Sequence, residues 1–551
     1  MIYLILFLTI VLRFLFTSEM PPSLNWDEIS HGYNAYSILK TGSDEWGNFL
    51  PSIFRAYGDY KLPVYIYLTS ISELFFGLTP FAVRLPNILA GIGTVYFTYL
   101  LVLRLFKENK QLALLSAFLV AVEPWTFFIG RPAFEANLAS FFFVAATYLF
   151  LKGVQENKSS LPSIILYGLT VWTYNSYRIF TPLFLITLHI VYWRELKNII
   201  RLQKISVIKI LLVATLFFIP MFYQLINPVG TARYSKVTII HEGALNKINE
   251  KRGNLQLKYS PMLAKIIANK ITFFSSEFIK NYLSYFNPKF LFFEGGTQYQ
   301  FSVPNKGLLY LINLPFFFYG IYILLKQRNK EGVLLLTWLL LSPIAGSLTR
   351  ESPHVLRAVT MLPLPMIITA LGIFNAIKNL KEENKTIALL IYVFTILLLM
   401  ESYLLNYFVK YKTDYSQSWQ YGYKEVADYL TENKDNYAKV IMTKKNGEPH
   451  EFLLFYLKVD PKGFKDDKNL NRFYQSDWWW VDGFDNYYFI NDWDVPKTGF
   501  KFVQESKKTV DCRQAKCLLV TSPGNAPTAW RKIKTINFKN SKPAFELYEN
   551  N

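Results

Sequence analysis

Apolar residues gather in long blocks from the amino terminus to Met400, and this pattern constrains the fold more than any other feature. The chain has 551 residues, of which 52% are hydrophobic and only 18% charged. A helix needs roughly 20 apolar residues to cross a bilayer. Clear candidate spans are 112–128, 138–151, 180–193, 210–226, 308–325, 333–348, 355–374 and 387–400. Shorter or more polar candidates are 1–16, 81–106 and 161–173. The sequence therefore predicts an α-helical integral membrane protein with about 11 transmembrane helices.

Short basic segments indicate the orientation. Lys and Arg are concentrated between candidate spans at 107–110, 194–204, 326–330 and 378–385. Placing all four in the cytoplasm is consistent with an odd number of spans, an inside amino terminus and an outside carboxyl terminus. The first apolar segment lacks the basic start and cleavage site of a signal peptide, so we expect it to remain as a helix. The net charge of +19 is spread over membrane-flanking segments and the tail, which favours anionic lipid over nucleic acid as a partner.

The pattern predicts two domains. A transmembrane module covers 1–402 and includes outside loops at 17–80 and 227–304. The tail, 403–551, alternates short apolar runs with helical patterns, as expected for an α/β domain on the extracytoplasmic surface. Its runs are 425–433, 439–443, 451–457, 487–490, 517–521 and 535–538. The two cysteines, Cys512 and Cys517, lie in this tail, where an oxidising compartment would allow a disulfide and unpaired thiols are the alternative.

The first outside loop contains two helical patterns. Asn25 suits the N-cap of a helix over 26–39 that stops near Gly42. A second helix over 63–76 is expected to lie in the membrane interface. Crossing the membrane is the alternative for this helix, but it would invert every later loop and break the charge bias.

Ionisable and polar side chains collect at the predicted outer ends of the spans. Asp27 and Glu28 open the first-loop helix, and His31 follows at a spacing that lets all three share one face. Further along come Asp44, Glu45, Asp59, Lys61, Arg84, Arg131, Glu135, Tyr174, Arg178, Arg350, His354 and Arg357. A carboxylate can act as a general base or hold a divalent ion, and Arg or Lys can hold a leaving phosphate. Because nucleotide-activated donors are not expected outside the cytoplasm, we expect the donor to arrive on a lipid carrier.

Each of these residues has a simpler structural interpretation. Asp27 and Glu28 could merely charge a helix N-terminus. Glu135 could pair with Arg131, four residues earlier on the same face. The remaining alternatives are turn chemistry for Asp44 and Glu45, interfacial anchoring for Arg84, Arg178 and Arg357, and a polar neighbour rather than a ligand for His31.

Two tail motifs are ambiguous. Trp478, Trp479 and Trp480 could stack on sugars, but aromatic core is the favoured interpretation. Asp492 and Asp494 imitate a nucleotide-sugar metal pair, which we interpret as incidental in a tail that faces away from nucleotide sugars.

These segments together resemble GT-C fold glycosyltransferases, the broad group that holds protein O-mannosyltransferases and aminoarabinose lipid A transferases. The order of the segments along the chain and their topological placement carry the resemblance. The matching residues are Leu24 to Glu28, Gly32 to Tyr36, Gly42 to Gly47, Pro51, Gly58 to Tyr65, Phe76, Gly77, Val83 to Pro86, Glu123 to Trp125, Arg131 to Glu135, Tyr174 to Arg178 and Pro353 to Ala358.

The resemblance implies transfer of a sugar from a polyprenyl-phosphate carrier to an extracytoplasmic protein, lipid or glycan. It implies that Asp27 is the general base, with Glu28 beside it, and that Glu135 is a second acid. Lys61 would contact the carrier phosphate, although one residue separates it from Pro63. The other candidates for carrier contact are Asp59, Arg84, Arg131, Tyr174, Arg178, His354 and Arg357. No cofactor is certain, and a divalent cation at Asp27, Glu28 and His31 is left open.

Two rival functions are left open. A lipid-linked oligosaccharide polymerase or ligase would use a diphosphate-linked donor at the same outer face. A transporter or lipid flippase would place ionisable groups at the midplane, whereas this chain gathers them at the outer rim. The sugar, the acceptor and the oligomeric state are not indicated by the sequence.

Overall fold

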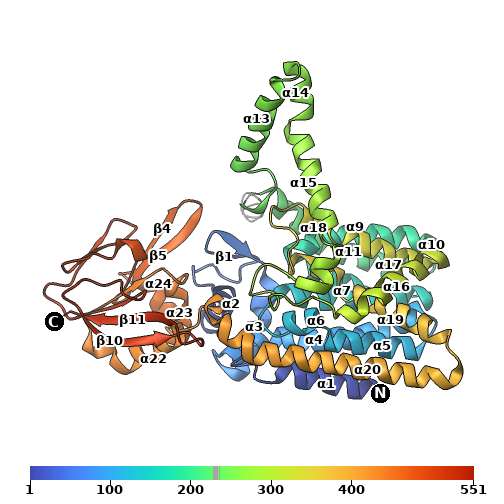
Figure 1. Cartoon of the computed structure of the whole chain (residues 1–551), viewed down its shortest axis with the longest axis horizontal. Coiled ribbons are helices and arrows are strands. Elements are labelled where there is room, and N and C mark those ends of the chain that lie inside the picture. The colour runs from blue at the N-terminus through green and yellow to red at the C-terminus, as the bar shows by residue number, and fades with distance from the viewer. Residues whose placement is uncertain (228–233, 235, 551) are drawn as a thin grey trace. The chain divides into compact units, whose positions relative to one another are not determined.

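Contacts within the chain divide it into two compact units. The computed structural model describes residues 1–227, 234 and 236–550. One unit comprises Met1–Leu15 with Asn87–Tyr403, and the other comprises Phe16–Pro86 with Leu404–Asn551 (Figure 1). We call them the bundle unit and the loop–tail unit. The first outside loop therefore groups with the tail, whereas the sequence grouped it with the spans.

The bundle unit is built mainly of helices in its described residues. Its amino-terminal half contains α1 (Ile2–Phe14), most of α4 (Pro80–Leu105), α5 (Lys110–Val122), α6 (Pro124–Ile129), α7 (Glu135–Gln155), α8 (Leu161–Val171), α9 (Asn175–Val191), α10 (Trp193–Leu202) and α11 (Lys204–Ile226). Its second half contains α13 (Glu242–Gln256), α14 (Pro261–Ile267), α15 (Lys270–Ser284), α16 (Leu314–Gln327), α17 (Lys330–Leu341), α18 (Ile344–Ser347), α19 (Leu364–Lys378) and most of α20 (Glu382–Leu405). Short helical segments are η1 (Lys289–Glu294), η2 (Leu311–Asn313) and η3 (Arg357–Met361).

Four helical segments in the described part of the chain are long and apolar enough to cross a membrane, or five if the bent pair α9–α10 counts as one. The four are Pro80–Leu105, Glu135–Gln155, Lys204–Ile226 and Glu382–Asp414. The predicted number was about 11 spans. Several predicted spans are broken or shorter helices, and the block 112–128 divides between α5 and α6 at Glu123 and Pro124. Proline at the start of α6 lacks the N–H that would continue the helix.

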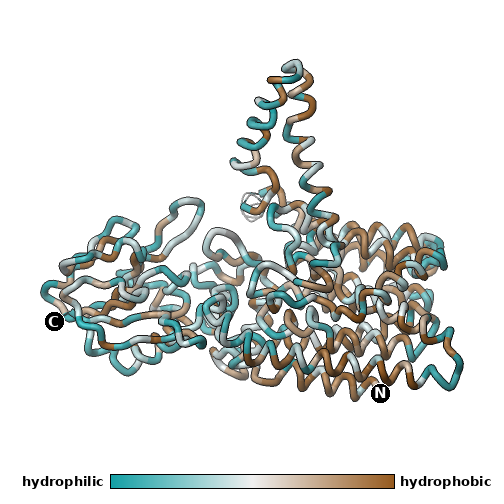
Figure 2. The backbone as a smooth tube through the Cα atoms, viewed as in Figure 1, coloured by the Kyte–Doolittle hydropathy of each residue, from teal (hydrophilic) through white to brown (hydrophobic). Residues whose placement is uncertain are grey.

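The predicted second outside loop is largely helical. Helices α13, α14 and α15 form an arm that projects from the bundle in Figure 1. The bundle helices are predominantly apolar in Figure 2, whereas the arm mixes both kinds of residue. Large apolar side chains such as Leu257 and Ile271 are exposed on the arm. Positions 228–233 and 235 of this predicted loop lie outside the described residues.

The loop–tail unit begins with the segment that the sequence predicts to be the first outside loop. It contains α2 (Trp26–Thr41), the hairpin of β1 (Phe54–Ala56) and β2 (Asp59–Lys61), and α3 (Pro63–Phe76). The predicted helices over 26–39 and 63–76 are confirmed.

The tail folds around a seven-stranded sheet of order β10-β11-β9-β3-β6-β5-β4. Its strands are β3 (Lys439–Thr443), β4 (Asn471–Gln475), β5 (Trp478–Phe484), β6 (Tyr487–Ile490), β9 (Cys517–Thr521), β10 (Arg531–Asn537) and β11 (Pro543–Glu549). A separate hairpin pairs β7 (Lys501–Val503) with β8 (Thr509–Asp511). Helical segments are η4 (Asn406–Tyr411), α21 (Lys412–Asp414), η5 (Ser416–Trp419), α22 (Tyr423–Asn433), η6 (Lys434–Asn436), α23 (Pro449–Tyr456), α24 (Pro461–Asp466) and η7 (Asp492–Asp494). The central strand β3 runs parallel to both neighbours, β6 and β9, which confirms the α/β character predicted for the tail.

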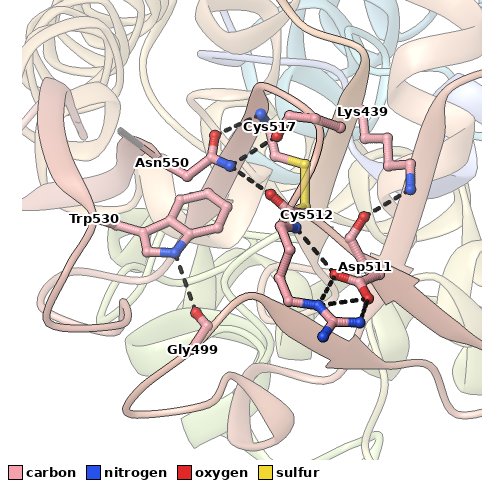
Figure 3. Close-up of a disulfide and its surroundings, with 9 residues drawn as sticks. Lys439, Gly499, Asp511, Cys512, Cys517, Trp530 and Asn550 are labelled. Carbon is pink, nitrogen blue, oxygen red and sulfur yellow. Dashed lines mark hydrogen bonds and ion pairs between the residues drawn. A yellow bond between two sulfur atoms is a disulfide. The ribbon is translucent and has the colours of Figure 1, made fainter.

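The two cysteines form a disulfide, so the paired alternative is confirmed (Figure 3). The amide of Asn550 donates to the Cys512 carbonyl at 2.8 Å and accepts from the Cys517 backbone N–H at 2.7 Å. Both cysteines are buried in an apolar cluster with Phe502 and Trp530. The disulfide is thus part of the tail's core, next to the end of the chain.

The interpretation of the three consecutive tryptophans as core is wrong. Trp478, Trp479 and Trp480 are all partly exposed at the start of β5, and the buried part of the strand begins at Val481. The strand leaves the core at this point, so the indole rings lie at the surface of the unit.

We predict that Gly320 and Gly372 are required where α16 crosses α19. A Cβ at Gly320 would collide with the Ile368 carbonyl oxygen, and one at Gly372 with the Phe316 carbonyl oxygen. Backbone atoms cannot move aside as a side chain can, so Gly320→Ala or Gly372→Ala should destabilise the protein by about 1–3 kcal/mol. Thermal unfolding in detergent would measure this. The control is Gly253→Ala in α13, where a Cβ meets nothing within 4 Å; an equal loss there would refute the packing explanation.

Candidate functional site

The amino terminus of α2 places the two first-loop acids in different environments. Asn25 caps the helix, as predicted: its side chain accepts from the Glu28 backbone N–H at 3.0 Å, and Glu28 accepts from the Asn25 backbone N–H at 3.1 Å. Gly42 ends the helix in the left-handed conformation. Consecutive residues on a helix point about 100° apart. Glu28 is fully buried, whereas the Asp27 side chain is 48% exposed.

Glu28 and Arg84 form a buried ion pair. The Arg84 Nε donates to one Glu28 carboxylate oxygen at 2.9 Å, and Nη2 donates to the other at 3.2 Å. The other guanidinium hydrogens go to the carbonyls of Thr17, Pro21 and Ser23. A guanidinium has five N–H donors, and this geometry uses all five. Arg84 therefore has no donor left for the phosphate contact expected from the sequence, and we assign it a structural role.

Asp27 instead meets a lysine. The β1–β2 hairpin carries Lys61 at the end of β2, and its Nζ lies 2.5 Å from a carboxylate oxygen of Asp27. The Lys61 side chain is only 5% exposed, so the ammonium group is held near the half-exposed carboxylate. A carboxylate that reaches solvent beside a buried cation is suited to bind a hydroxyl group and accept its proton.

His31 and Asp44 are less exposed than Asp27. His31 is fully buried, and its ring packs 5.0 Å from that of Tyr65. The backbone of Asp59 pairs with Ala56 in the hairpin, and its side chain lies outside the described part of the structure. Asp44 accepts from the backbone N–H groups of Trp46 and Asn48, which confirms turn chemistry there.

No group of three or more His, Cys, Asp or Glu side chains among the described residues is arranged to hold a metal ion. The oxygens of Glu28 face Arg84 and the helix cap, and His31 is packed on an aromatic ring. Asp27, Glu28 and His31 therefore do not fit a common metal site.

The loop–tail unit also contains buried carboxyl groups. Burial raises the pKa of both Glu45 and Glu451, whose carboxyl groups are hydrogen-bonded to each other. Burial also raises the pKa of Glu448 to about 7. It lowers the pKa of His450 well below its usual value, so this imidazole is neutral at pH 7. Each of these pKa shifts disfavours the charged form, because the buried surroundings solvate a charge poorly.

The bundle unit holds the other predicted site residues. Arg131 is fully buried and donates to the carbonyls of Leu12 and Leu15, which caps the end of α1. Glu135 is the half-buried first residue of α7.

Tyr174 and Arg178 surround the start of α9. Tyr174 is its buried N-cap residue. Arg178 is also buried; it donates to the Val171 carbonyl at 3.1 Å and to the Gln224 amide oxygen at 2.7 Å. Arg178 therefore links α8, α9 and α11 and, like Arg131, has a structural part in the bundle.

His354 and Arg357 lie beside a cavity of about 330 Å³. His354 lines it together with Arg350 and Glu351. Arg357 donates to the Thr349 hydroxyl at 2.7 Å and contacts the Glu351 carboxylate at 3.3 Å. Glu351 was not predicted as a site residue. The sequence offered one signal for it, its position six residues before Arg357. The turn between the two residues brings their side chains together.

Comparisons with known proteins agree with this architecture. The family described as dolichyl-phosphate-mannose-protein mannosyltransferase matches residues 61–223. ArnT from Cupriavidus metallidurans bound to undecaprenyl phosphate has a TM-score of 0.54 at 11% identity, over 100% of this chain and 98% of that one. The chain has a GT-C fold. The oligosaccharyltransferase of Archaeoglobus fulgidus in complex with Zn and sulfate gives a TM-score of 0.50 at 15% identity, over 83% of this chain and 61% of that one.

One curated relative is similar over a shorter stretch. The putative mannosyltransferase YkcB of Bacillus subtilis (strain 168) is 34% identical over 114 residues, or 20% of this chain. The match spans only 16% of that relative's length. The GT-C fold confirms the resemblance seen in the sequence.

We predict that the Glu28–Arg84 pair holds the amino terminus of α2 in place. Glu28→Gln or Arg84→Met should each destabilise the protein by about 3–5 kcal/mol, because the partner would become an uncompensated buried charge. Thermal unfolding in detergent measures this, and the double variant should lose less than the sum of the two single losses. Lys424→Gln is the matched control, since Lys424 and Asp428 form an exposed pair in the same unit. Strictly additive losses would contradict the pairing.

Proposed function

We propose that this chain is a membrane glycosyltransferase that moves a sugar from a polyprenyl-phosphate carrier to an extracytoplasmic acceptor. The proposal rests on the different environments of two adjacent acids. Glu28 is buried in the scaffold, whereas Asp27 is half-exposed beside Lys61. The GT-C fold supports it, and so does the ArnT structure, which is described as bound to undecaprenyl phosphate.

The proposed reaction is a displacement at the anomeric carbon. Asp27 accepts the proton of an acceptor hydroxyl while that oxygen attacks the carbon. The bond between the anomeric carbon and the phosphate oxygen breaks, and both bonding electrons stay with the phosphate on the carrier. The ammonium group of Lys61 stabilises the charge that develops on that oxygen. The sugar is transferred with inversion, and no covalent enzyme intermediate is needed.

Lys61 couples the two halves of this reaction. In the absence of donor its ammonium group contacts the Asp27 carboxylate. A carrier phosphate competes for the same cation, because phosphate oxygens are strong acceptors of charge-assisted hydrogen bonds. Donor binding would thus release Asp27 to take up the acceptor proton, which favours donor binding before acceptor activation.

The bundle-unit candidates are proposed as carrier contacts. His354 and Arg350 line a cavity, and Arg357 lies behind it. Glu135 and Tyr174 are proposed as further polar contacts at the starts of their helices, and Arg178 as a weaker one. We also propose that the shorter apolar helices join the longer ones in about 11 spans, with the amino terminus inside and the tail outside.

We predict that Asp27→Asn lowers transfer by about 10²- to 10⁴-fold, the usual contribution of general base catalysis. Membranes containing the variant would be assayed with radiolabelled polyprenyl-phosphate sugars. Asp466→Asn, an exposed acid of the tail, is the matched control. Full activity of the Asp27 variant would remove the proposed base. Competition by a diphosphate-linked glycan but not by a monophosphate carrier would identify a polymerase or ligase instead.

We further propose that transfer does not require a divalent cation, because Lys61 supplies positive charge next to Asp27. The predicted result is an unchanged initial rate after incubation with excess EDTA and gel filtration. The proposal would be contradicted if EDTA abolished activity and added Mg²⁺ or Mn²⁺ restored it. That result would point to metal ligands other than the combination of Asp27, Glu28 and His31.

A further inference from the structure

Two cavities on the loop–tail unit adjoin each other. They have volumes of about 430 and 390 Å³ and share Lys444, Lys445 and Trp480 as lining residues. The first cavity continues to Trp493, and the second continues to Trp26. We call their combined surface the tryptophan groove. One end of the groove is formed by Trp26, the residue that immediately precedes Asp27 in the chain.

Aromatic rings line the tryptophan groove along its length. Trp478 stacks on Tyr57 with ring centroids 5.8 Å apart, and Trp480 lies 5.7 Å from Trp478. Trp493 is 81% exposed at the far end. Tryptophan combines a large apolar face with a polar N–H, and one exposed indole together with partly exposed ones in adjoining cavities favours a binding surface. Flat apolar rings with polar edges suit sugar rings, which have C–H faces and hydroxyl rims.

Lysines add positive charge to the groove. Lys444 is paired within the protein with two acids, Asp482 at 2.6 Å and Glu505 at 3.1 Å, so it adds no net positive charge to the groove. Lys445 and Lys497 are exposed lining residues. The acids nearby are engaged: Glu448 accepts from the Trp478 indole at 2.9 Å, and Asp492 accepts from the Ser522 hydroxyl at 2.8 Å. The exposed cations therefore favour a ligand with negative charges.

The near end of the groove is fixed to the helix that carries Asp27. The Trp26 backbone N–H donates to the Gln420 side chain at 2.9 Å, and the Tyr57 hydroxyl donates to the Trp26 carbonyl at 2.8 Å. Gly447 has a φ of +114°, and a Cβ there would lie 3.3 Å from the Trp26 ring. The positive φ favours glycine in this turn after β3, and a side chain there would also crowd Gln420, whose amide nitrogen lies 2.7 Å from the Cβ position.

We propose that the tryptophan groove binds a glycan chain bearing phosphate or carboxylate groups, with its reactive end at Asp27. Sugar rings stack on Trp478, Trp480 and Trp493, and Lys445 and Lys497 contact the acidic groups. The binding stands on the groove alone, whereas the assignment of the bound glycan as the acceptor rests on the proposed glycosyltransferase function.

The test is a binding measurement on the full-length protein in detergent. The probes are polygalacturonate, a carboxylated glycan, and dextran, a neutral one, titrated while tryptophan fluorescence is followed. The expected result is saturable binding of polygalacturonate that weakens with salt, and at least tenfold weaker binding of dextran. Equal binding of the two would overturn the charge requirement, and failure of both to bind would overturn the groove.

Variants assign the binding to this surface. Trp493→Ala and, separately, Lys445→Gln with Lys497→Gln should each weaken polygalacturonate binding at least fivefold. The matched control is Lys462→Gln with Lys542→Gln, two exposed lysines elsewhere in the tail. Trp493 is too exposed for its loss to unfold the domain, which unchanged thermal unfolding would verify. Equal affinities in all variants would place the binding elsewhere and refute the proposal.

Asp27→Asn separates the two proposals. It should abolish transfer but leave polygalacturonate binding within twofold of the unmodified protein. If the unmodified protein binds the glycan in the groove but transfers no sugar, the glycosyltransferase proposal fails and the groove stands. If transfer occurs but the groove variants bind and react normally, the groove proposal fails by itself.

Discussion

A buried ion pair organises the loop–tail unit around α2. Glu28 closes the capping box at the amino terminus of the helix and also receives two hydrogen bonds from Arg84. The other donors of Arg84 hold the chain at Thr17, Pro21 and Ser23, which lead into the helix. A charge this deeply buried is tolerated only when each of its hydrogen-bonding groups is satisfied. The pair therefore fixes where the first turn of α2 begins.

This constraint gives adjacent acids different uses. Because Glu28 is turned into the protein, Asp27 is displayed toward solvent and toward the β1–β2 hairpin. The hairpin contributes Lys61, and Tyr57 in the turn of the same hairpin stacks on Trp478 of the tail. The proposed base, the proposed phosphate contact and the tryptophan groove are thus built on one rigid frame, which holds their relative geometry without a bound ligand.

Local features of this frame were predictable from the sequence, whereas its long-range pairings were not. Asn25 and Gly42 mark the two ends of α2 as expected. Helix capping and the left-handed conformation of a terminal glycine depend on only a few neighbouring residues. The strand β3 and its parallel neighbours also coincide with the apolar runs. Arg84, by contrast, is 56 residues from Glu28 in the sequence, and neither segment contains a pattern that indicates which residue its partner is. The three tryptophans were misread because an apolar run resembles core until the strand's exit from the sheet is known.

The complete use of the Arg84 donors also has an evolutionary consequence. Neither member of the pair can be replaced alone, because a neutral residue at position 28 or 84 would leave the other charge buried without a partner. Among homologues of this chain, these two positions should change in concert or remain as they are. A homologue with only one of them altered should have a rebuilt segment in place of residues 17–23, whose carbonyl groups would otherwise lose their donor.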